Sequence, residues 1–286
     1  ETDPKEHSMV APDAPVVLKV ENLNAGKMVQ NVSFELRKGE ILGFSGLMGA
    51  GRTETARALF GADPKQSGKI SIRGKDGQLR EVTINSPQDA VKYGIGYLSE
   101  DRRRYGCVVQ KSVTENTTLA TMEEFTSGIF INKSKEKEVS EKYVKELATK
   151  TPNCEQLVVN LSGGNQQKVI LGRWLLTNPD YLILDEPTNH LDRRSREKLY
   201  DFITSCRITL LVVSHDRTLL NLLASIAELS VGGITLYGGN YDFYKEQKEQ
   251  EQASMQERLE AKEKELRRVR KTCLLYTSPS PRDISG

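Results

Sequence analysis

The sequence lacks long apolar runs and a strong net charge. Its most apolar late stretch, residues 219–234, is interrupted by Asn221, Glu228 and two glycines, so it is too impure for a membrane-spanning helix. The 41 basic and 39 acidic residues leave a net charge of only +2, which gives no global reason to expect a polyanionic partner. Any role at a membrane must therefore work through a partner protein.

Cysteine is also scarce, and the few cysteines are scattered. Cys107, Cys154, Cys206 and Cys273 show no short paired spacing, which argues against a zinc site or a disulfide framework and fits a reducing cytoplasm. With 286 residues, 37% of them hydrophobic, the chain can hold one large α/β domain with an appendage, or two small domains. It begins at Glu1 rather than methionine, as a fragment of a longer protein would.

The first part of the chain reads as a linker followed by strands. Residues 1–15, rich in Pro, Asp, Glu and Lys, are predicted to be flexible, and the fold is expected to start near Val16. The segments VVLKVENL and VSFELRKG alternate like antiparallel strands, whereas GEILGFSG is a short apolar run typical of a buried central strand. A helix is predicted over residues 53–60.

The middle of the chain is more helical and more polar. We expect an inserted helical lobe over residues 86–178, with SPQDAVKYG and KSKEKEVSEKYVKELATK as its clearest helices. Two buried strands follow, YLILDE and TLLVVS, and residues 193–206 between them have helical spacing. This β-α-β unit places the carboxyl ends of parallel strands at one edge, beside the loop after GEILGFSG. The whole domain is expected to span residues 16–243.

The composition changes abruptly after Gly239. Residues 244–272 are dominated by Glu, Gln, Lys and Arg, with a thin apolar stripe of Met255, Leu259, Leu266 and Val269. This pattern predicts a long, mostly solvated helix, either without specific function or as one arm of a helical hairpin. Residues 273–286 break the pattern and resemble translated sequencing-adapter sequence, so we expect them to be disordered and exclude them from the fold.

A glycine-rich loop between the GEILGFSG strand and its helix predicts a phosphate site. GLMGAGRT matches the pattern G-x-x-x-x-G-K-[ST], except that arginine replaces lysine. Its backbone N–H groups and the helix dipole suit ATP phosphates, and a hydroxyl at its end can ligate Mg²⁺. The predicted nucleotide-binding residues here are Gly46, Leu47, Met48, Gly49, Ala50, Gly51, Arg52, Thr53 and Glu54, with Thr53 also a metal ligand. The planar arginine fork preserves charge but changes shape, so turnover is expected to suffer more than binding.

Three later motifs complete the predicted site. Asp185 can hold Mg²⁺ through water, and Glu186 can act as general base toward the attacking water. His215, after TLLVVS, can bond the γ-phosphate and the same water. LSGGNQQK predicts a helix N-terminus with free N–H groups suited to a γ-phosphate. Its candidate residues are Ser162, Gly163 and Gly164.

Taken together, these motifs resemble those of ATP-binding cassette ATPases. Residues 16–188 are similar to the second nucleotide-binding domain of bacterial ribose, galactose and xylose importer ATPases, through RKGEILGFSGLMGAGRTE, GIGYLSEDRRRYG and LSGGNQQKVILGRWLLTNP. The resemblance implies an α/β fold with a mixed central sheet, an antiparallel β subdomain and a helical subdomain. It accounts for Arg52, and it places Glu100 where most cassette ATPases carry a glutamine that contacts Mg²⁺ and senses the permease. Residues 21–30 contain no aromatic side chain to stack on adenine.

From Glu186 onward the sequence resembles a different branch, the class F cassette proteins that act on ribosomes. The matching segments are EPTNHLD, VVSHDRTLLN and LYGGNYDFYKEQKEQE. We therefore interpret the chain as a chimera joined within LILDEPT. Because both donors share the β-α-β core, the fold is expected to survive. Poor fits between the residue 199–203 helix face and the importer-like part are the main risk, at about 1 to 3 kcal/mol for each large side chain.

The importer resemblance implies the leading function. It predicts an ATPase that binds Mg-ATP, pairs with a second nucleotide-binding domain, and drives monosaccharide import through membrane permease subunits from the cytoplasmic, inner face of the cell membrane. The resemblance also implies that Ser162–Gly164 bind the ATP of the other subunit. The alternatives are a class F translation factor that contacts the ribosome and tRNA, and a fragment that binds nucleotide without a biological role.

Overall fold

The computed structural model describes residues 10, 13–47, 49–128, 130–230 and 232–277, with side chains up to residue 270. These residues divide into two compact units, Glu1–Tyr241 and Asp242–Gly286. Most of the linker predicted over residues 1–15 falls outside the described residues. Within the described part of the chain, no helix is both long and apolar enough to cross a membrane.

The first unit is built on a six-stranded sheet in the order β12-β11-β3-β10-β9-β6. Its strands are β3 (Ile41–Gly46), β6 (Ile95–Leu98), β9 (Tyr181–Asp185), β10 (Thr209–Val213), β11 (Ser225–Ser230) and β12 (Gly233–Gly238). All neighbours are parallel except β11 and β12. Every residue of β9 and β10 is buried, as expected for central parallel strands that are covered on both faces. The mixed central sheet predicted from the sequence is confirmed.

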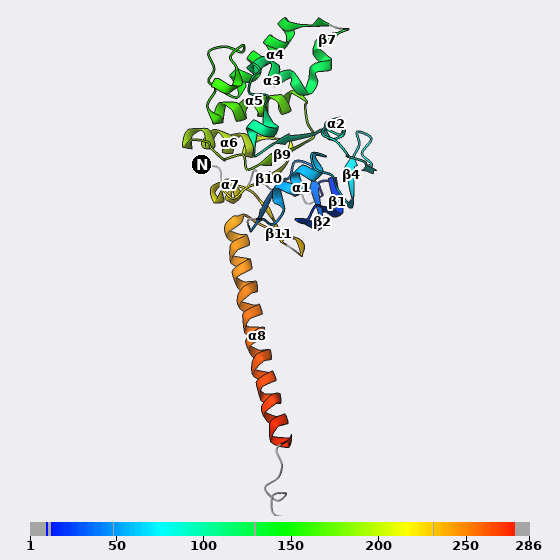
Figure 1. Cartoon of the computed structure of the whole chain (residues 1–286), viewed down its shortest axis with the longest axis vertical. Helices are drawn as coiled ribbons and strands as arrows, with labels where there is room; N and C mark the ends of the chain where they lie inside the picture. Colours follow the sequence, from blue (N-terminus) through cyan, green and yellow to red (C-terminus); the bar gives the residue numbers. More distant parts are fainter. Residues whose placement is uncertain (1–9, 11–12, 48, 129, 231, 278–286) are drawn as a thin grey trace, which may run out of the picture. The chain divides into compact units, whose positions relative to one another are not determined.

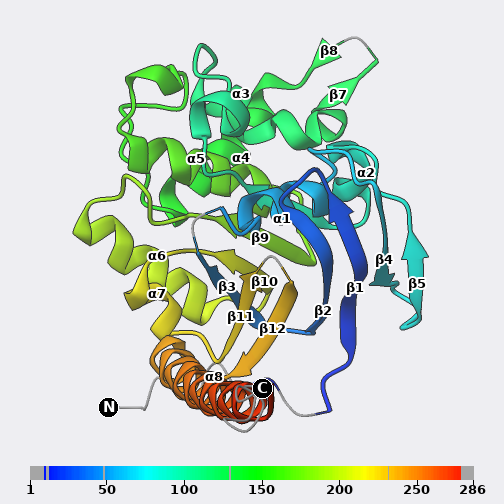
Figure 2. The ribbon, with the colours of Figure 1, turned by 60° about the horizontal axis from the view of Figure 1, so that its bottom comes forward.

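A second, antiparallel sheet lies beside the first in the order β2-β1-β4-β5 (Figure 2). It contains β1 (Val16–Ala25), β2 (Val29–Arg37), β4 (Ser67–Arg73) and β5 (Leu79–Val82). The alternating segments predicted as antiparallel strands pair as expected, with Val20 opposite Phe34. In β2, buried and exposed residues alternate strictly from Val32 to Arg37, as the sequence pattern indicated.

Helices cover the central sheet and form a separate lobe (Figure 1). The helices of the sheet region are α1 (Arg52–Leu59), α2 (Pro87–Lys92), α6 (Arg193–Ser205) and α7 (Arg217–Asn221). The lobe contains α3 (Val113–Thr118), α4 (Lys133–Glu146), α5 (Gly163–Leu176), the short helices η2 (Arg102–Gly106), η3 (Leu119–Phe125) and η4 (Val158–Asn160), and the hairpin of β7 (Thr126–Ser127) and β8 (Phe130–Ile131).

The predicted start of the helical lobe at residue 86 is wrong. Residues 87–98 contain α2 and β6, and β6 is an edge strand of the central sheet, paired with β9. All four residues of β6 are buried, but four residues are too few to show a strand period next to a helix. The lobe proper therefore begins after Leu98.

The described residues of the second unit belong to one long helix, α8 (Tyr241–Thr277). The stripe residues Met255, Leu259, Leu266 and Val269 are all exposed on it. The helix passes the predicted boundary at residue 272, so the expectation of disorder from residue 273 is wrong for residues 273–277. No Pro or Gly interrupts the sequence between Tyr241 and Pro279, and adding a residue to an existing helix is easy. Residues 278–286 lie outside the described residues.

Candidate functional site

The phosphate loop joins the end of β3 to the start of α1. Gly46, Gly49 and Gly51 have φ values of 141°, 81° and 85°, which other residues rarely adopt. A Cβ on Gly46 would lie 2.5 Å from the backbone oxygen of Leu229, and one on Gly51 would lie 2.7 Å from that of Met28. Only glycine therefore lets this backbone turn so tightly. Met48, predicted to bind nucleotide, lies outside the described residues.

The start of α1 leaves its first N–H groups available to a ligand. Its N-cap is Gly51, and no side chain caps the helix, so the usual acceptor at this position is missing. The loop supplies one internal bond, from Ala50 N to the carbonyl of Leu47, whose side chain is largely exposed. Glu54 lies in the first helical turn. A glycine cradle ahead of an uncapped helix fits a polyphosphate anion.

The predicted metal ligands meet at the carboxyl end of the sheet. Thr53 Oγ1 donates a hydrogen bond to Asp185 Oδ1 at 3.0 Å. Asp185 is fully buried, and this burial raises its carboxyl pKa to about 6, against the hydrogen bonds from Tyr97 and Thr53 that lower it. A hydroxyl and a carboxylate side by side form an oxygen donor set of the kind that Mg²⁺ takes together with phosphate oxygens.

Tyr97 is a site residue that the sequence analysis missed. Its hydroxyl donates to Asp185 Oδ2 at 2.7 Å, and burial beside this carboxylate raises the tyrosine pKa. In the sequence it is one aromatic residue in an apolar strand and looks like core. Its closeness to the acidic residues follows only from the pairing of β6 with β9.

The predicted general base lies next to both arginine and histidine. Glu186 is buried and has a φ of 45°, a left-handed backbone that costs a non-glycine residue roughly 1–2 kcal/mol. Its Oε2 lies 2.7 Å from His215 Nδ1, and its Oε1 lies 3.8 Å from Arg52 Nη2. The histidine side chain is 65% exposed, so the pair has one member in the interior and one facing solvent.

Arg52 occupies the position of the usual lysine and reaches two strand ends. Besides the contact with Glu186, its Nη1 donates to the Ser214 carbonyl at 3.3 Å. The arginine therefore links the phosphate loop to the segments that follow β9 and β10. Glu100, also predicted, is exposed and accepts a hydrogen bond from Asn189 Nδ2 at 3.3 Å. It is close enough to Asp185 to raise the pKa of that carboxyl.

The third predicted group does not join this cluster. Ser162 is the N-cap of α5 and Gly163 and Gly164 are its first residues, so the predicted helix N-terminus is present. In the described residues no hydrogen bond or ion pair connects this segment to the phosphate loop. Gly163 instead packs against the Arg102 guanidinium, and Gln167, one turn further on, donates to the Pro187 carbonyl at 2.7 Å.

Comparison with known families agrees with this arrangement. A family described as ABC transporter matches residues 29–189, more than half of the chain, and a second family with the same description matches residues 227–273. The chain belongs to the ABC transporter family. The first match spans the phosphate loop, the α5 N-terminus and the acidic pair of this ABC cassette.

Curated relatives match the same part of the ABC cassette. A "Putative ribose/galactose/methyl galactoside import ATP-binding protein 2" of Burkholderia cenocepacia (strain HI2424) is 46% identical over 189 residues, which are 66% of this chain and 36% of that protein. A "Ribose import ATP-binding protein RbsA" of Clostridium perfringens (strain SM101 / Type A) is 43% identical over 205 residues, 70% of this chain and 40% of that protein. The chain spans less than half the length of these relatives.

Solved structures confirm the fold of the cassette. A dimeric ATP-binding cassette in a post-hydrolysis state, bound to ADP and Pi, has a TM-score of 0.64 at 20% identity, over 77% of this chain and 98% of that one. A nucleotide-free cassette from an ABC transporter has a TM-score of 0.65 at 21% identity, over 81% of this chain and 94% of that one.

Proposed function

We propose that the chain binds Mg-ATP and, as a dimer, hydrolyses it to energise monosaccharide import through membrane permease subunits. The cluster at the carboxyl end of the sheet carries the proposal, because it places a buried carboxylate, Glu186, beside the phosphate loop and the Thr53–Asp185 pair. The names of the sugar-import relatives support the sugar class. Such a protein would work at the inner face of the cell membrane.

Each residue of the cluster has a chemical task in this proposal. Gly46–Thr53 would hold the phosphates through backbone N–H groups and the Arg52 guanidinium. Thr53 and Asp185 would hold Mg²⁺, which neutralises phosphate charge when bound, and Tyr97 would orient the aspartate. Glu186 would accept a proton from the attacking water, and His215 would fix the carboxylate through its 2.7 Å contact.

The test is ATP turnover in the wild type and in the Glu186→Gln variant. Loss of the general base is expected to lower the rate by about 10²- to 10⁴-fold. Glu197→Gln is a matched control, because Glu197 is an exposed carboxylate on α6 that pairs only with Arg193 in the described residues. Equal rates in Glu186→Gln and the wild type would remove Glu186 from its proposed role, whereas a loss in both variants would indicate a folding defect.

The second candidate is a ribosome-associated factor, with the chain a chimera of two cassette genes and of adapter sequence from residue 273. The basic residues Arg267, Arg268 and Arg270 on α8 motivate it, whereas the family that matches residues 227–273 is described only as ABC transporter. Co-sedimentation with ribosomes should then depend on these three arginines. Unbroken genomic reads across the codons for residues 184–192 would instead argue against a chimera.

A further inference from the structure

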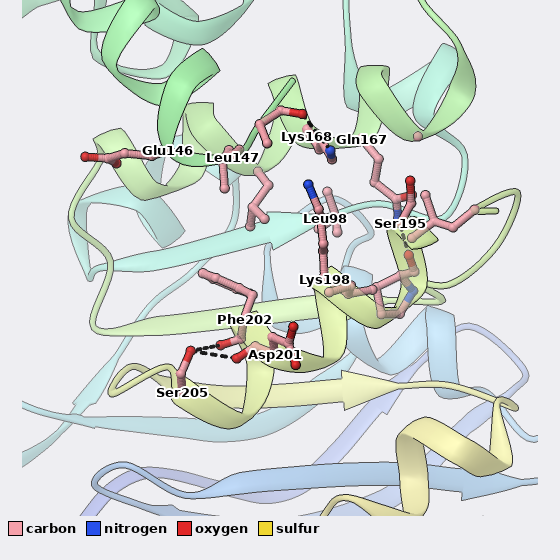
Figure 3. A pocket seen from close by; sticks show the side chains of 16 residues that line it. Leu98, Glu146, Leu147, Gln167, Lys168, Ser195, Lys198, Asp201, Phe202 and Ser205 are labelled. Atoms are coloured by element: carbon pink, nitrogen blue, oxygen red, sulfur yellow. Dashed lines mark hydrogen bonds between the residues drawn. The ribbon is translucent and has the colours of Figure 1, made fainter. Parts of the chain in front are cut away.

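A cleft outside the nucleotide site lies between α5 and α6 (Figure 3). Its volume is about 420 Å³, within the range of small-molecule sites. Leu98, Leu171 and Pro187 form a buried apolar lining. Gly164, Leu191 and Ser195 line the cleft near the α5 N-terminus, where a Cβ on Gly164 would lie 3.2 Å from the Leu191 side chain.

α6 contributes two partly covered apolar side chains to the wall of the cleft. α6 is strongly amphipathic, yet Ile203 is its only buried residue. Leu199 and Phe202, on the same helix, are half-buried and line the cleft. This is the helix face at which the sequence analysis placed the main risk of a poor fit. The cleft therefore offers apolar side chains that no protein group covers fully.

Two lysines, one on each helix, line the cleft. Lys198 extends from α6 toward Lys168 on α5 (Figure 3), and neither ammonium forms an ion pair within the described part of the chain. Lys168 donates to the Ala148 carbonyl at 2.9 Å, and burial, followed by the charge of Lys198, lowers its pKa. Glu146 and Asp201 also line the cleft, and Glu146 pairs with Lys142. An anion between Lys168 and Lys198 would relieve their repulsion.

One buried polar atom in the lining also lacks a partner. Gln167 is 7% exposed, and its Oε1 accepts no hydrogen bond from any described residue, although its Nε2 donates to Pro187. A buried acceptor without a donor is unfavourable, so a bound molecule with an O–H or N–H group, or a water that it retains, would satisfy this atom. Gln167 lies between the α5 N-terminus and the segment that follows Glu186.

We propose that this cleft binds a small amphipathic anion, with an aromatic or branched apolar body against Leu199 and Phe202 and an acidic group between Lys168 and Lys198. The inference does not depend on the proposed ATPase function, because the phosphate loop, Asp185 and Glu186 do not line the cleft, and Gly164 is the one lining residue that the two sites share. A ligand here would contact Gln167 and Pro187. It would therefore lie next to the hydrogen bond between these two residues, which connects α5 to the segment that follows Glu186.

The test is titration of the nucleotide-free full chain with 2-naphthoate, with neutral 2-naphthalenemethanol as the matched probe. Saturable one-to-one binding of the naphthoate, tighter than that of the alcohol, is expected. Lys198→Gln should weaken naphthoate binding about three- to tenfold and leave the alcohol unchanged, whereas Lys198→Arg should retain both. Phe202→Ala should weaken both probes by about tenfold.

Two results would overturn the proposal. One is the absence of saturable naphthoate binding by the wild type, and the other is equal naphthoate affinity in the wild type, Lys198→Gln and Phe202→Ala proteins. Lys198 is exposed, so its variants should fold. The comparison of Lys198→Gln with the wild type therefore decides the outcome even if the Phe202→Ala protein does not fold. No nucleotide is present, so failure here is distinguishable from failure of ATP turnover.

Discussion

Arg52 is the residue through which this cassette departs from the usual phosphate loop. Its guanidinium contacts Glu186 and the Ser214 carbonyl, so these two protein groups fix the position of the arginine side chain. We expect Arg52→Met to weaken ATP binding by about ten- to a hundredfold, because a charge-assisted contact with phosphate contributes about 1.5–3 kcal/mol. Titration with a fluorescent ATP analogue measures this, and Arg52→Lys should stay within about threefold of the wild type. Unchanged affinity in Arg52→Met would exclude a contact between Arg52 and phosphate.

Tyr97 is expected to matter for stability as well as for the site. Tyr97→Phe removes the hydroxyl that donates to Asp185 Oδ2 at 2.7 Å, so this buried carboxylate oxygen loses a hydrogen-bond donor. The free energy of unfolding in urea should fall by about 1–3 kcal/mol. The matched control is Tyr93→Phe, since Tyr93 lies in the same region and is exposed. A loss of equal size in both variants would show that the Asp185 contact contributes nothing specific.

At the scale of single elements, the capping box of α3 gives a prediction about pH. Glu115 accepts hydrogen bonds from Lys111 Nζ and from the Ser112 backbone, and these contacts lower its pKa to about 2. A carboxyl whose pKa is lower in the folded state stabilises the fold above its unfolded pKa of about 4.5, and this contribution is lost as the pH falls toward 2. Because the Glu115 side chain is 33% exposed, we expect this contribution to be at most about 1 kcal/mol.

Glu115→Gln isolates this charge, because glutamine also suits the capping position. Urea unfolding at pH 7 should show the variant less stable than the wild type by up to about 1 kcal/mol, and the two curves should converge near pH 2–3. Glu141→Gln on α4, whose carboxylate is mostly exposed, serves as the control. A difference between Glu115→Gln and the wild type that stays constant with pH would point to packing instead of charge.

The elements also show where sequence patterns are sufficient and where they are not. Long or strongly patterned segments, such as β1, β2, α4 and α6, were predictable because a period over many residues fixes one buried face. β6 was not predictable, because four buried residues show no alternation of buried and exposed positions. The role of Tyr97, which lies on this strand, was missed for the same reason. The helix beyond residue 272 was missed because unusual composition was taken for disorder, although no helix-breaking residue is present before Pro279.

In the whole molecule, the groups predicted to act on ATP are divided between two places. The phosphate loop, Thr53, Asp185, Glu186 and His215 meet at one end of the sheet. Motif spacing made this cluster predictable, since parallel strands end at a common edge. The Ser162–Gly164 segment begins α5 in the helical lobe and has no bond to the cluster in the described residues. In the proposed dimer, this segment of a second copy would approach the cluster of the first.

This division predicts nucleotide-dependent association. The Glu186→Gln variant, in which bound ATP should persist, is expected to sediment as a dimer with Mg-ATP and as a monomer without nucleotide. Adding Ser162→Phe, at an exposed helix start, should prevent the dimer and leave ATP affinity within about threefold, because the segment lies away from the phosphate loop of its own chain. Sedimentation velocity, combined with a nucleotide-binding titration, measures both quantities. A dimer that forms equally well without ATP, or that tolerates Ser162→Phe, would mean that association does not use the α5 N-terminus, and the nucleotide site would then have to be complete within one chain.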